Sequence, residues 1–190
     1  YRRRVEKLPQ SSGAFVIYLG VDAAAIPENC PPHLQFLYDY ERSIGENNSL
    51  FVSVSRPGDG RALVGKATIT ASSFTDPLIW EQTQDYEALK QAYMEEAIAR
   101  LGQFFHLSAT TIIHQEAATP RTFAHFTGRT QGIVGGIGQR LSTFGPFGFA
   151  TRTPVQGLWL VGDSTHPGEG TAGVSYSALT AVNQLMAGNR

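Results

Sequence analysis

The chain has 190 residues, of which 42% are hydrophobic, and its formal net charge at pH 7 is −1. This length and composition suit one or two domains with a substantial core, and the near-neutral charge gives no support for a nucleic-acid partner. The single cysteine, Cys30, excludes an internal disulfide framework. The five histidines show neither HExxH nor paired His/Cys spacing, so we predict no metal site.

Four strands are predicted in the first part of the chain. Residues 14–21 (AFVIYLGV) are rich in β-forming residues, residues 34–38 form a second apolar run, and residues 49–55 (SLFVSVS) alternate cleanly. Residues 62–73 predict a fourth strand, which follows the strong turn signal of residues 57–60 (PGDG). A glycine-rich link between the last two strands favours a hairpin and therefore an antiparallel sheet.

The pattern changes from strand to helix after the break at residues 76–77. Apolar residues recur at helical spacing through residues 85–105, which predict a long amphipathic helix covering one face of the sheet. A further strand is expected at residues 110–117, and Pro120 can start a short helix over residues 121–126. The predicted fold class is therefore α+β, with an antiparallel sheet backed by a long helix.

A glycine-rich segment then occupies residues 128–149. It holds seven glycines, interleaved with Phe144, Phe147 and Phe149, and shows neither helix nor strand periodicity. Such a segment is either a surface loop or the lining of a ligand space where side chains must be absent. It is not a phosphate P-loop, because no Gly-Lys-Ser/Thr follows.

Residues 157–190 have the strongest functional pattern. The apolar run 158–161 (LWLV) predicts a buried strand, Asp163 follows at its end, and a glycine-rich loop leads into a helical pattern over residues 174–185. Helix N-termini leave amide groups free and carry partial positive charge. Strand, glycine loop and helix start therefore predict an anion or cofactor site.

The glycines of this loop also match the dinucleotide fingerprint G-x-G-x-x-G. Gly168, Gly170 and Gly173 have the right spacing, but five residues separate them from the strand. The fingerprint needs a tight turn directly after the strand and a second strand with an acidic residue about 20 residues later. The chain ends first, so we reject a first βαβ unit here.

The run GLWLVGDSTHPGEGTAGV resembles the C-terminal FAD-contacting motif of the carotenoid desaturase and isomerase flavoproteins, the phytoene desaturase-like relatives of the amine oxidases. Upstream pieces agree in order: a YEALKQ helix, ATPRT at residues 118–122, FTGR at 126–129 and FGPFG at 144–148. The resemblance covers residues 76–190 well and the earlier part loosely. Its nearest match is with bacterial C-3′,4′ carotenoid desaturases.

The resemblance implies a two-part organisation. Residues 1–156 would form most of a substrate or cap domain with a glycine-rich return segment. Residues 157–190 would return to a Rossmann-like FAD-binding domain as its last strand and helix. The family's N-terminal FAD-binding half has no counterpart in this chain, which also starts without Met. We therefore expect a cut piece that is inactive alone and partners the N-terminal FAD-binding half of the same protein.

The same motif implies the cofactor contacts. Asp163, following Gly162, would accept hydrogen bonds from the ribityl chain or lie beside the pyrophosphate of FAD. The amides of Gly173 and Val174 would face the pyrimidine edge of the flavin, where the helix dipole stabilises negative charge. Gly170, Thr171 and Ala172 would be small because the isoalloxazine lies close. The alternative for Gly162 and Asp163 is an ordinary strand-end turn.

The implied reaction is desaturation of a carotenoid polyene by hydride transfer to the flavin, so the cofactor carries the difficult step. We assign no catalytic residue. His166 and Glu169 are candidates, with a loop-shaping role the favoured alternative for His166. Arg121 and Arg152 are expected to pair with carboxylates or with FAD. Five phenylalanines either line a substrate tunnel or belong to the core: Phe123, Phe126, Phe144, Phe147 and Phe149.

A carotenoid substrate implies a cytoplasmic protein peripheral to a membrane surface, without a spanning helix. No strongly amphipathic basic helix is visible, so this contact is expected outside the chain. Alternatives remain: a carotenoid cis–trans isomerase, an amine-oxidase-like flavoprotein, or a non-catalytic binding domain if no Rossmann half lies upstream.

Overall fold

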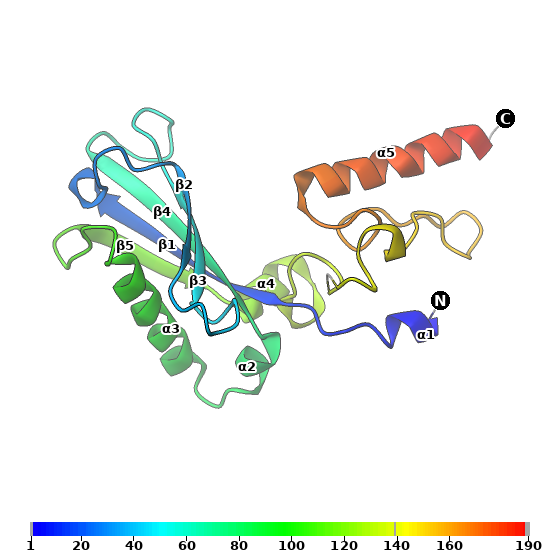
Figure 1. Cartoon of the computed structure of the whole chain (residues 1–190), viewed down its shortest axis with the longest axis horizontal. Helices are drawn as coiled ribbons and strands as arrows, with labels where there is room; N and C mark the ends of the chain where they lie inside the picture. The colour runs from blue at the N-terminus through cyan, green and yellow to red at the C-terminus, as the bar shows by residue number, and fades with distance from the viewer. Residues whose placement is uncertain (1, 139, 189–190) are drawn as a thin grey trace. The chain divides into compact units, whose positions relative to one another are not determined.

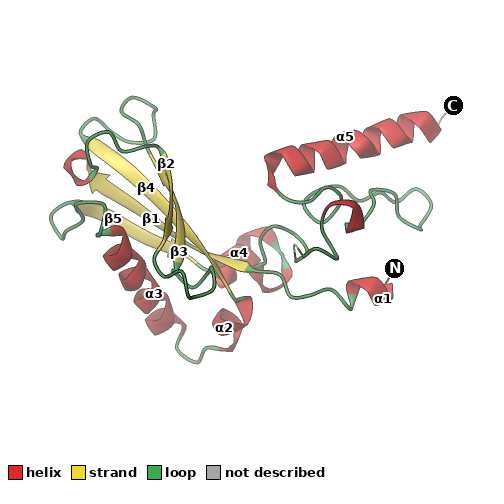
Figure 2. Ribbon diagram, in the orientation of Figure 1, coloured by secondary structure: helices red, strands yellow, loops and turns green. Residues whose placement is uncertain are grey.

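The computed structural model of the chain describes residues 2–138 and 140–188. The chain divides into two compact units (Figure 1). Gly13–Gly132 is called the sheet unit below, and Tyr1–Ser12 together with Ile133–Arg190 is called the terminal unit. All strands of the described residues lie in the sheet unit (Figure 2). The domain boundary expected after residue 156 stays a prediction.

The sheet unit contains a five-stranded antiparallel sheet in the order β2-β3-β4-β1-β5. The strands are β1 (Gly13–Asp22), β2 (His33–Leu37), β3 (Ser49–Val54), β4 (Lys66–Thr75) and β5 (Ile112–Ala118). The helices and 3₁₀ turns of this unit are η1 (Ala23–Ala25), α2 (Pro77–Gln82), α3 (Tyr86–Leu101), α4 (Pro120–Thr127) and η2 (Thr130–Gly132). The predicted α+β fold, with an antiparallel sheet backed by a long helix, is confirmed.

One face of the sheet carries the core. Alternating residues of the central strands are fully buried there, as period-2 patterning requires, and α3 lies along this face (Figure 1). Met94, Ala97 and Leu101 of α3 are buried against the strands. Trp80 of α2 is completely buried and stacks on Phe15 of β1 at 5.7 Å between ring centroids. Helix packing on an apolar sheet face therefore stabilises this unit.

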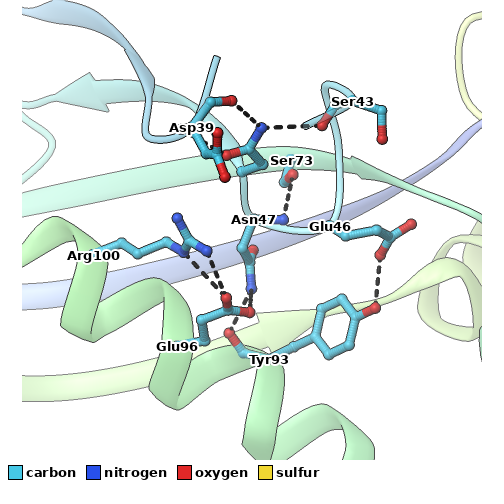
Figure 3. Close-up of polar contacts among 9 residues, drawn as sticks. Asp39, Ser43, Glu46, Asn47, Ser73, Tyr93, Glu96 and Arg100 are labelled. Atoms are coloured by element: carbon cyan, nitrogen blue, oxygen red, sulfur yellow. Dashed lines mark hydrogen bonds and ion pairs between the residues drawn. The ribbon is translucent and has the colours of Figure 1, made fainter. Parts of the chain in front are cut away.

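The loop between β2 and β3 is fixed to α3 by buried polar side chains (Figure 3). Glu46 and Asn47 have positive φ angles of 47° and 60°. The Asn47 amide group donates to the Tyr93 carbonyl oxygen at 3.0 Å, and its backbone N–H donates to Ser73 Oγ at 3.0 Å. The buried Asn48 side chain closes the same loop through the backbone of Asp39. Side-chain hydrogen bonds thus hold a backbone conformation that non-glycine residues seldom adopt.

The terminal unit contains α1 (Arg2–Val5), η3 (Gly145–Phe147) and α5 (Gly170–Gly188). The predicted C-terminal helix is confirmed by α5. The prediction of a buried strand at residues 158–161 is wrong for the described structure. Trp159 forms one isolated bridge with Arg152, and Leu158 and Val161 expose 50% and 57% of their surface. A strand needs a neighbouring ladder to satisfy its backbone groups. Among the described residues, 158–161 have only this single bridge, and the unit's other bridge joins Phe149 to Thr165.

Candidate cofactor site

The predicted cofactor residues all lie in the terminal unit, on one loop and the helix that follows it. Gly162 and Asp163 open the loop, and α5 begins at Gly170. Thr171, Ala172, Gly173 and Val174 follow within the first turns of this 19-residue helix. The structure therefore brings the predicted residues together on one strand-free loop and one helix start.

Buried hydroxyl groups tie this loop to the helix. Ser177 is fully buried and accepts a hydrogen bond from the backbone N–H of Gly162 at 3.1 Å. Thr165, also buried, donates to the Gly162 carbonyl oxygen at 2.8 Å and contacts the Ser177 hydroxyl. Gly173, Ser177 and Ala181 follow at i, i+4 spacing, so one small-residue face of α5 meets the loop. Thr165 and Ser177 were not predicted from the sequence. Small residues at every fourth position of α5 are a signal for Ser177.

The glycines of the motif serve two different purposes. A Cβ at Gly173 would clash with the carbonyl oxygen of Gly168, so close backbone packing requires glycine there. Gly162 and Gly170 have φ angles of 119° and 85°, and a Cβ at either position would meet nothing within 4 Å. Their backbone therefore borders open space, which a bound group could approach closely.

The glycine-rich segment packs on the same loop. A Cβ at Gly136 would come within 2.7 Å of the Asp163 carbonyl carbon, and one at Gly135 would clash with the Glu169 carboxylate. The Gly136 carbonyl oxygen also accepts a hydrogen bond from Ser11 Oγ at 2.7 Å. These glycines allow two chain segments to pack closely. Neither the surface-loop nor the ligand-lining interpretation of residues 128–149 included this role.

The other candidate side chains make contacts within the fold. His166 Nδ1 lies 2.7 Å from the Gly145 carbonyl oxygen, which supports the loop-shaping role. Arg121 donates to the Trp80 carbonyl oxygen at 2.8 Å and lies over the Tyr86 ring, and Arg152 lies over the Trp159 ring. The expected pairing of these arginines with carboxylates is not found among the described contacts.

The predicted aromatic side chains do not form one buried group. Phe149 is buried beneath the Arg4 guanidinium, which lies 4.2 Å from the ring centroid. Phe126, Phe144 and Phe147 are at least half exposed. Phe123 is half-buried. Of the five phenylalanines, only Phe149 is therefore fully buried, as the core interpretation expects.

The start of α5 can offer backbone amides to an anion. The first turn of the helix carries no acidic side chain, whereas Glu169 directly precedes it and partly offsets the positive charge of the helix start. Asp163 is half-buried beside Ser164, whose hydroxyl donates to it at 3.3 Å. No group of three metal-ligating side chains occurs among the described residues. The arrangement can therefore bind negatively charged oxygens through backbone amides and accept hydroxyl hydrogen bonds at Asp163.

A separate hollow of about 500 Å³ lies in the same unit. It is lined by residues 152–159 together with Gln184 and Leu185 of α5. None of the predicted cofactor residues lines it. Across the described residues, no helix combines the length and apolarity that a membrane crossing requires.

Sequence comparison finds that this chain is similar to proteins named chloroplastic prolycopene isomerases. No protein-family model matches it. It is similar to the chloroplastic prolycopene isomerase of Arabidopsis thaliana, with 31% identity over 182 residues that cover 90% of this chain and 30% of the relative. The corresponding Daucus carota protein is 28% identical over 178 residues, covering 90% and 29%.

Prolycopene isomerase 1 of an Oncidium hybrid cultivar is 27% identical over 202 residues, which cover 97% of this chain and 34% of the relative. The chain thus spans about a third of the length of these relatives. The narrower resemblance to C-3′,4′ desaturases receives no support from them.

Proposed function

We propose that this chain is part of an FAD-dependent enzyme that isomerises cis double bonds of a carotene. The observation that carries the proposal is the similarity to prolycopene isomerases across nine-tenths of the chain. Desaturation of a carotenoid is the alternative reaction, because the sequence motif resembles that of both kinds of enzyme. The assignment to isomerisation follows the relatives, and an experiment can separate the two reactions.

The open face of the sheet supports an apolar substrate. Opposite the face covered by α3, Tyr18, Phe51 and Phe74 expose 40%, 50% and 50% of their surface. A hollow of about 300 Å³ lies over β3 and β4, bordered by Ala14, Phe51 and Phe74 together with Gln35, Ser49, Ser72 and Ser73. Exposed aromatic side chains around an apolar hollow are typical of a hydrophobic ligand surface. We propose that this face contacts the polyene.

The loop at residues 162–174 supports FAD binding. Gly162 and Gly170 border open space, α5 presents its N-terminus, and Asp163 can accept hydroxyl hydrogen bonds. Bound there, FAD would accept a hydride if the reaction is desaturation, and would act without net oxidation of the carotene if it is isomerisation. Gly173 and Val174 would face the flavin through their backbone amides, and Gly170, Thr171 and Ala172 would leave room for the isoalloxazine. Asp163 would orient the ribityl chain.

An exposed apolar surface on α5 supports a partner for the terminal unit. Leu179, Val182 and Met186 are 57%, 54% and 67% exposed, and the helix carries no charged side chain. Helices of this composition are normally buried. We propose that an N-terminal FAD-binding half of the same protein covers this helix and completes the cofactor site.

The test uses the natural protein that contains this chain, purified and titrated with FAD. We expect stoichiometric FAD, seen in its absorbance bands, and conversion of prolycopene to its all-trans isomer with no change in mass. Chromatography with mass detection distinguishes this from desaturation, which removes two hydrogens. A product two hydrogens lighter would replace isomerisation by desaturation. Failure to bind FAD would refute the enzyme assignment and favour a non-catalytic binding domain.

A further inference from the structure

The connection between β3 and β4 displays two apolar side chains in full contact with solvent. Residues 55–65, called the β3–β4 tip below, include Leu63 at 82% and Val64 at 103% relative exposure. Neither side chain contributes to the core, and leaving both in water forgoes the free energy gained when apolar surface is buried. An adjacent, fully exposed apolar pair at a loop end indicates a contact surface.

The β3–β4 tip is held in a defined shape. The Lys66 N–H donates to the Leu63 carbonyl oxygen at 2.9 Å, and Gly65 has a φ of 76°, so residues 63–66 form a tight turn with Val64 at its corner. The Ala23 N–H donates to the Gly65 carbonyl oxygen at 3.0 Å, which fixes the turn to the end of β1. The turn therefore presents its apolar corner without further ordering.

A second part of the tip is fixed by Asp59. Its carboxylate accepts hydrogen bonds from the backbone N–H groups of Arg56 and Arg61 at 2.7 and 2.9 Å, and it forms an ion pair with the Arg61 side chain. These bonds lower the pKa of Asp59 to about 2, with the Arg61 side chain the largest cause. The carboxylate is thus occupied within the tip.

Cationic groups flank the apolar pair. Arg56, Arg61 and Lys66 stand against the single carboxylate of Asp59 within residues 55–66. Lys66 also pairs with Asp22 at 3.0 Å, while the Arg56 guanidinium has no ion pair in the part of the chain that the structure describes. A hollow of about 280 Å³ at the base of the tip is bordered by Arg56, Lys66, Ile26 and Pro27.

We propose that the β3–β4 tip is a membrane-contact element. Leu63 and Val64 enter the interfacial layer of a phospholipid bilayer, while Arg56 and Lys66 lie against anionic lipid phosphates. Apolar insertion and attraction to anionic headgroups together determine the strength of such interfacial binding. This inference goes beyond the proposed function, since its test requires neither carotenoid nor FAD.

The loop at residues 38–48 provides a matched control, because it enters β3 at the end opposite the β3–β4 tip. It also exposes apolar side chains, Tyr40 at 84% and Ile44 at 68%. Its charge has the opposite sign, since Asp39, Glu41 and Glu46 stand against a single arginine. Substitutions here change exposed apolar surface to a similar degree without altering the tip.

The first experiment measures flotation of the protein with vesicles of phosphatidylcholine and phosphatidylglycerol. We expect the double substitution Leu63→Ser with Val64→Ser to lower the membrane partition coefficient ~10-fold or more. The double substitution Tyr40→Ser with Ile44→Ser should leave this coefficient unchanged. Arg56→Gln should weaken binding to these vesicles, and added salt should do the same. Equal binding of wild type and tip variant, or no binding of wild type, overturns the proposal.

A second readout places the contact directly. A nitrobenzoxadiazole label on Val64→Cys, in a Cys30→Ser background, should gain intensity and shift to the blue when vesicles are added. The same label on Ile44→Cys should remain unchanged. A response at position 44 that equals the response at position 64 would overturn the assignment of the contact to the tip. Circular dichroism confirms that each variant is folded.

Discussion

The Tyr93 phenol on α3 donates a hydrogen bond of 2.7 Å to Oε2 of Glu46 in the β2–β3 loop (Figure 3). The same carboxylate accepts hydrogen bonds from the Thr75 hydroxyl at 2.8 Å and the Asp76 N–H at 2.7 Å. Thr75 in turn accepts a bond from the indole N–H of the buried Trp80. One carboxylate thus joins the loop, the end of β4 and both helices on the core face.

Replacing Tyr93 by phenylalanine tests this junction. Tyr93→Phe removes one of three hydrogen bonds to Glu46, and bonds to charged groups contribute about 1.5–3 kcal/mol. We expect the free energy of unfolding in denaturant titration to fall by about that amount. Tyr18→Phe, on the open face of the sheet, should change it by less than about 0.5 kcal/mol. Equal effects of the two substitutions would show that the Glu46 bond is unimportant.

Alkaline pH should weaken the same region. Burial, and secondarily the hydrogen bond to Glu46, raises the pKa of Tyr93, and burial raises the pKa of Tyr38 to about 12. The pKa of a tyrosine in an unfolded chain is about 10. The stabilisation is therefore complete below that pH and is lost as pH rises toward the folded-state values.

We expect the free energy of unfolding to fall as pH rises from about 10 toward about 12, and the slope to decrease in the double variant Tyr38→Phe with Tyr93→Phe. Tyrosinate absorbance provides an independent measurement, since each substitution should remove one late-titrating group. Identical pH dependence of wild type and double variant would contradict the assignment.

Most elements of the sheet unit follow from local patterns. The alternation in residues 49–55 predicts β3, and helical periodicity predicts α3, because each pattern matches one buried face. α2 was missed: residues 76–77 were interpreted only as a break. In fact Asp76 caps that helix through the Leu78 N–H, and Pro77 begins it. The capping signal was present, but the helix is too short for periodicity to reveal it.

The site was predictable only in part. The loop and the start of α5 follow from glycine spacing and helical periodicity. The strand predicted at residues 158–161 is wrong, because a strand needs a neighbouring strand and local sequence cannot specify one. The contact of Gly136 with Asp163 joins segments 27 positions apart. Positive-φ glycines mark sharp turns in any loop, so sequence alone does not show which of them permit close packing.

The packing of Gly136 gives a further prediction. Gly136→Ala introduces a Cβ 2.7 Å from the Asp163 carbonyl carbon at a φ of 74°, whereas Gly157→Ala has a similar φ of 79° with nothing within 4 Å. The two share the left-handed penalty of about 1–2 kcal/mol. We expect the Gly136→Ala variant to be about 1–3 kcal/mol less stable than the Gly157→Ala variant in thermal or denaturant unfolding, because the cost of overpacking adds to the shared left-handed penalty. Equal destabilisation would mean that the contact relaxes without cost.

The proposed role of Asp163 is tested by Asp163→Asn in the natural protein that contains this chain. Asparagine keeps the size of the side chain but removes its charge, and a hydrogen bond to a charged acceptor contributes at least about 1.5 kcal/mol. We therefore expect FAD to bind about tenfold more weakly, measured by quenching of flavin fluorescence. Glu41→Gln, an exposed carboxylate of the sheet unit, should leave the affinity unchanged. If Asp163→Asn binds FAD as tightly as wild type, Asp163 does not contact the cofactor, and Gly162 and Asp163 form only the turn that precedes α5.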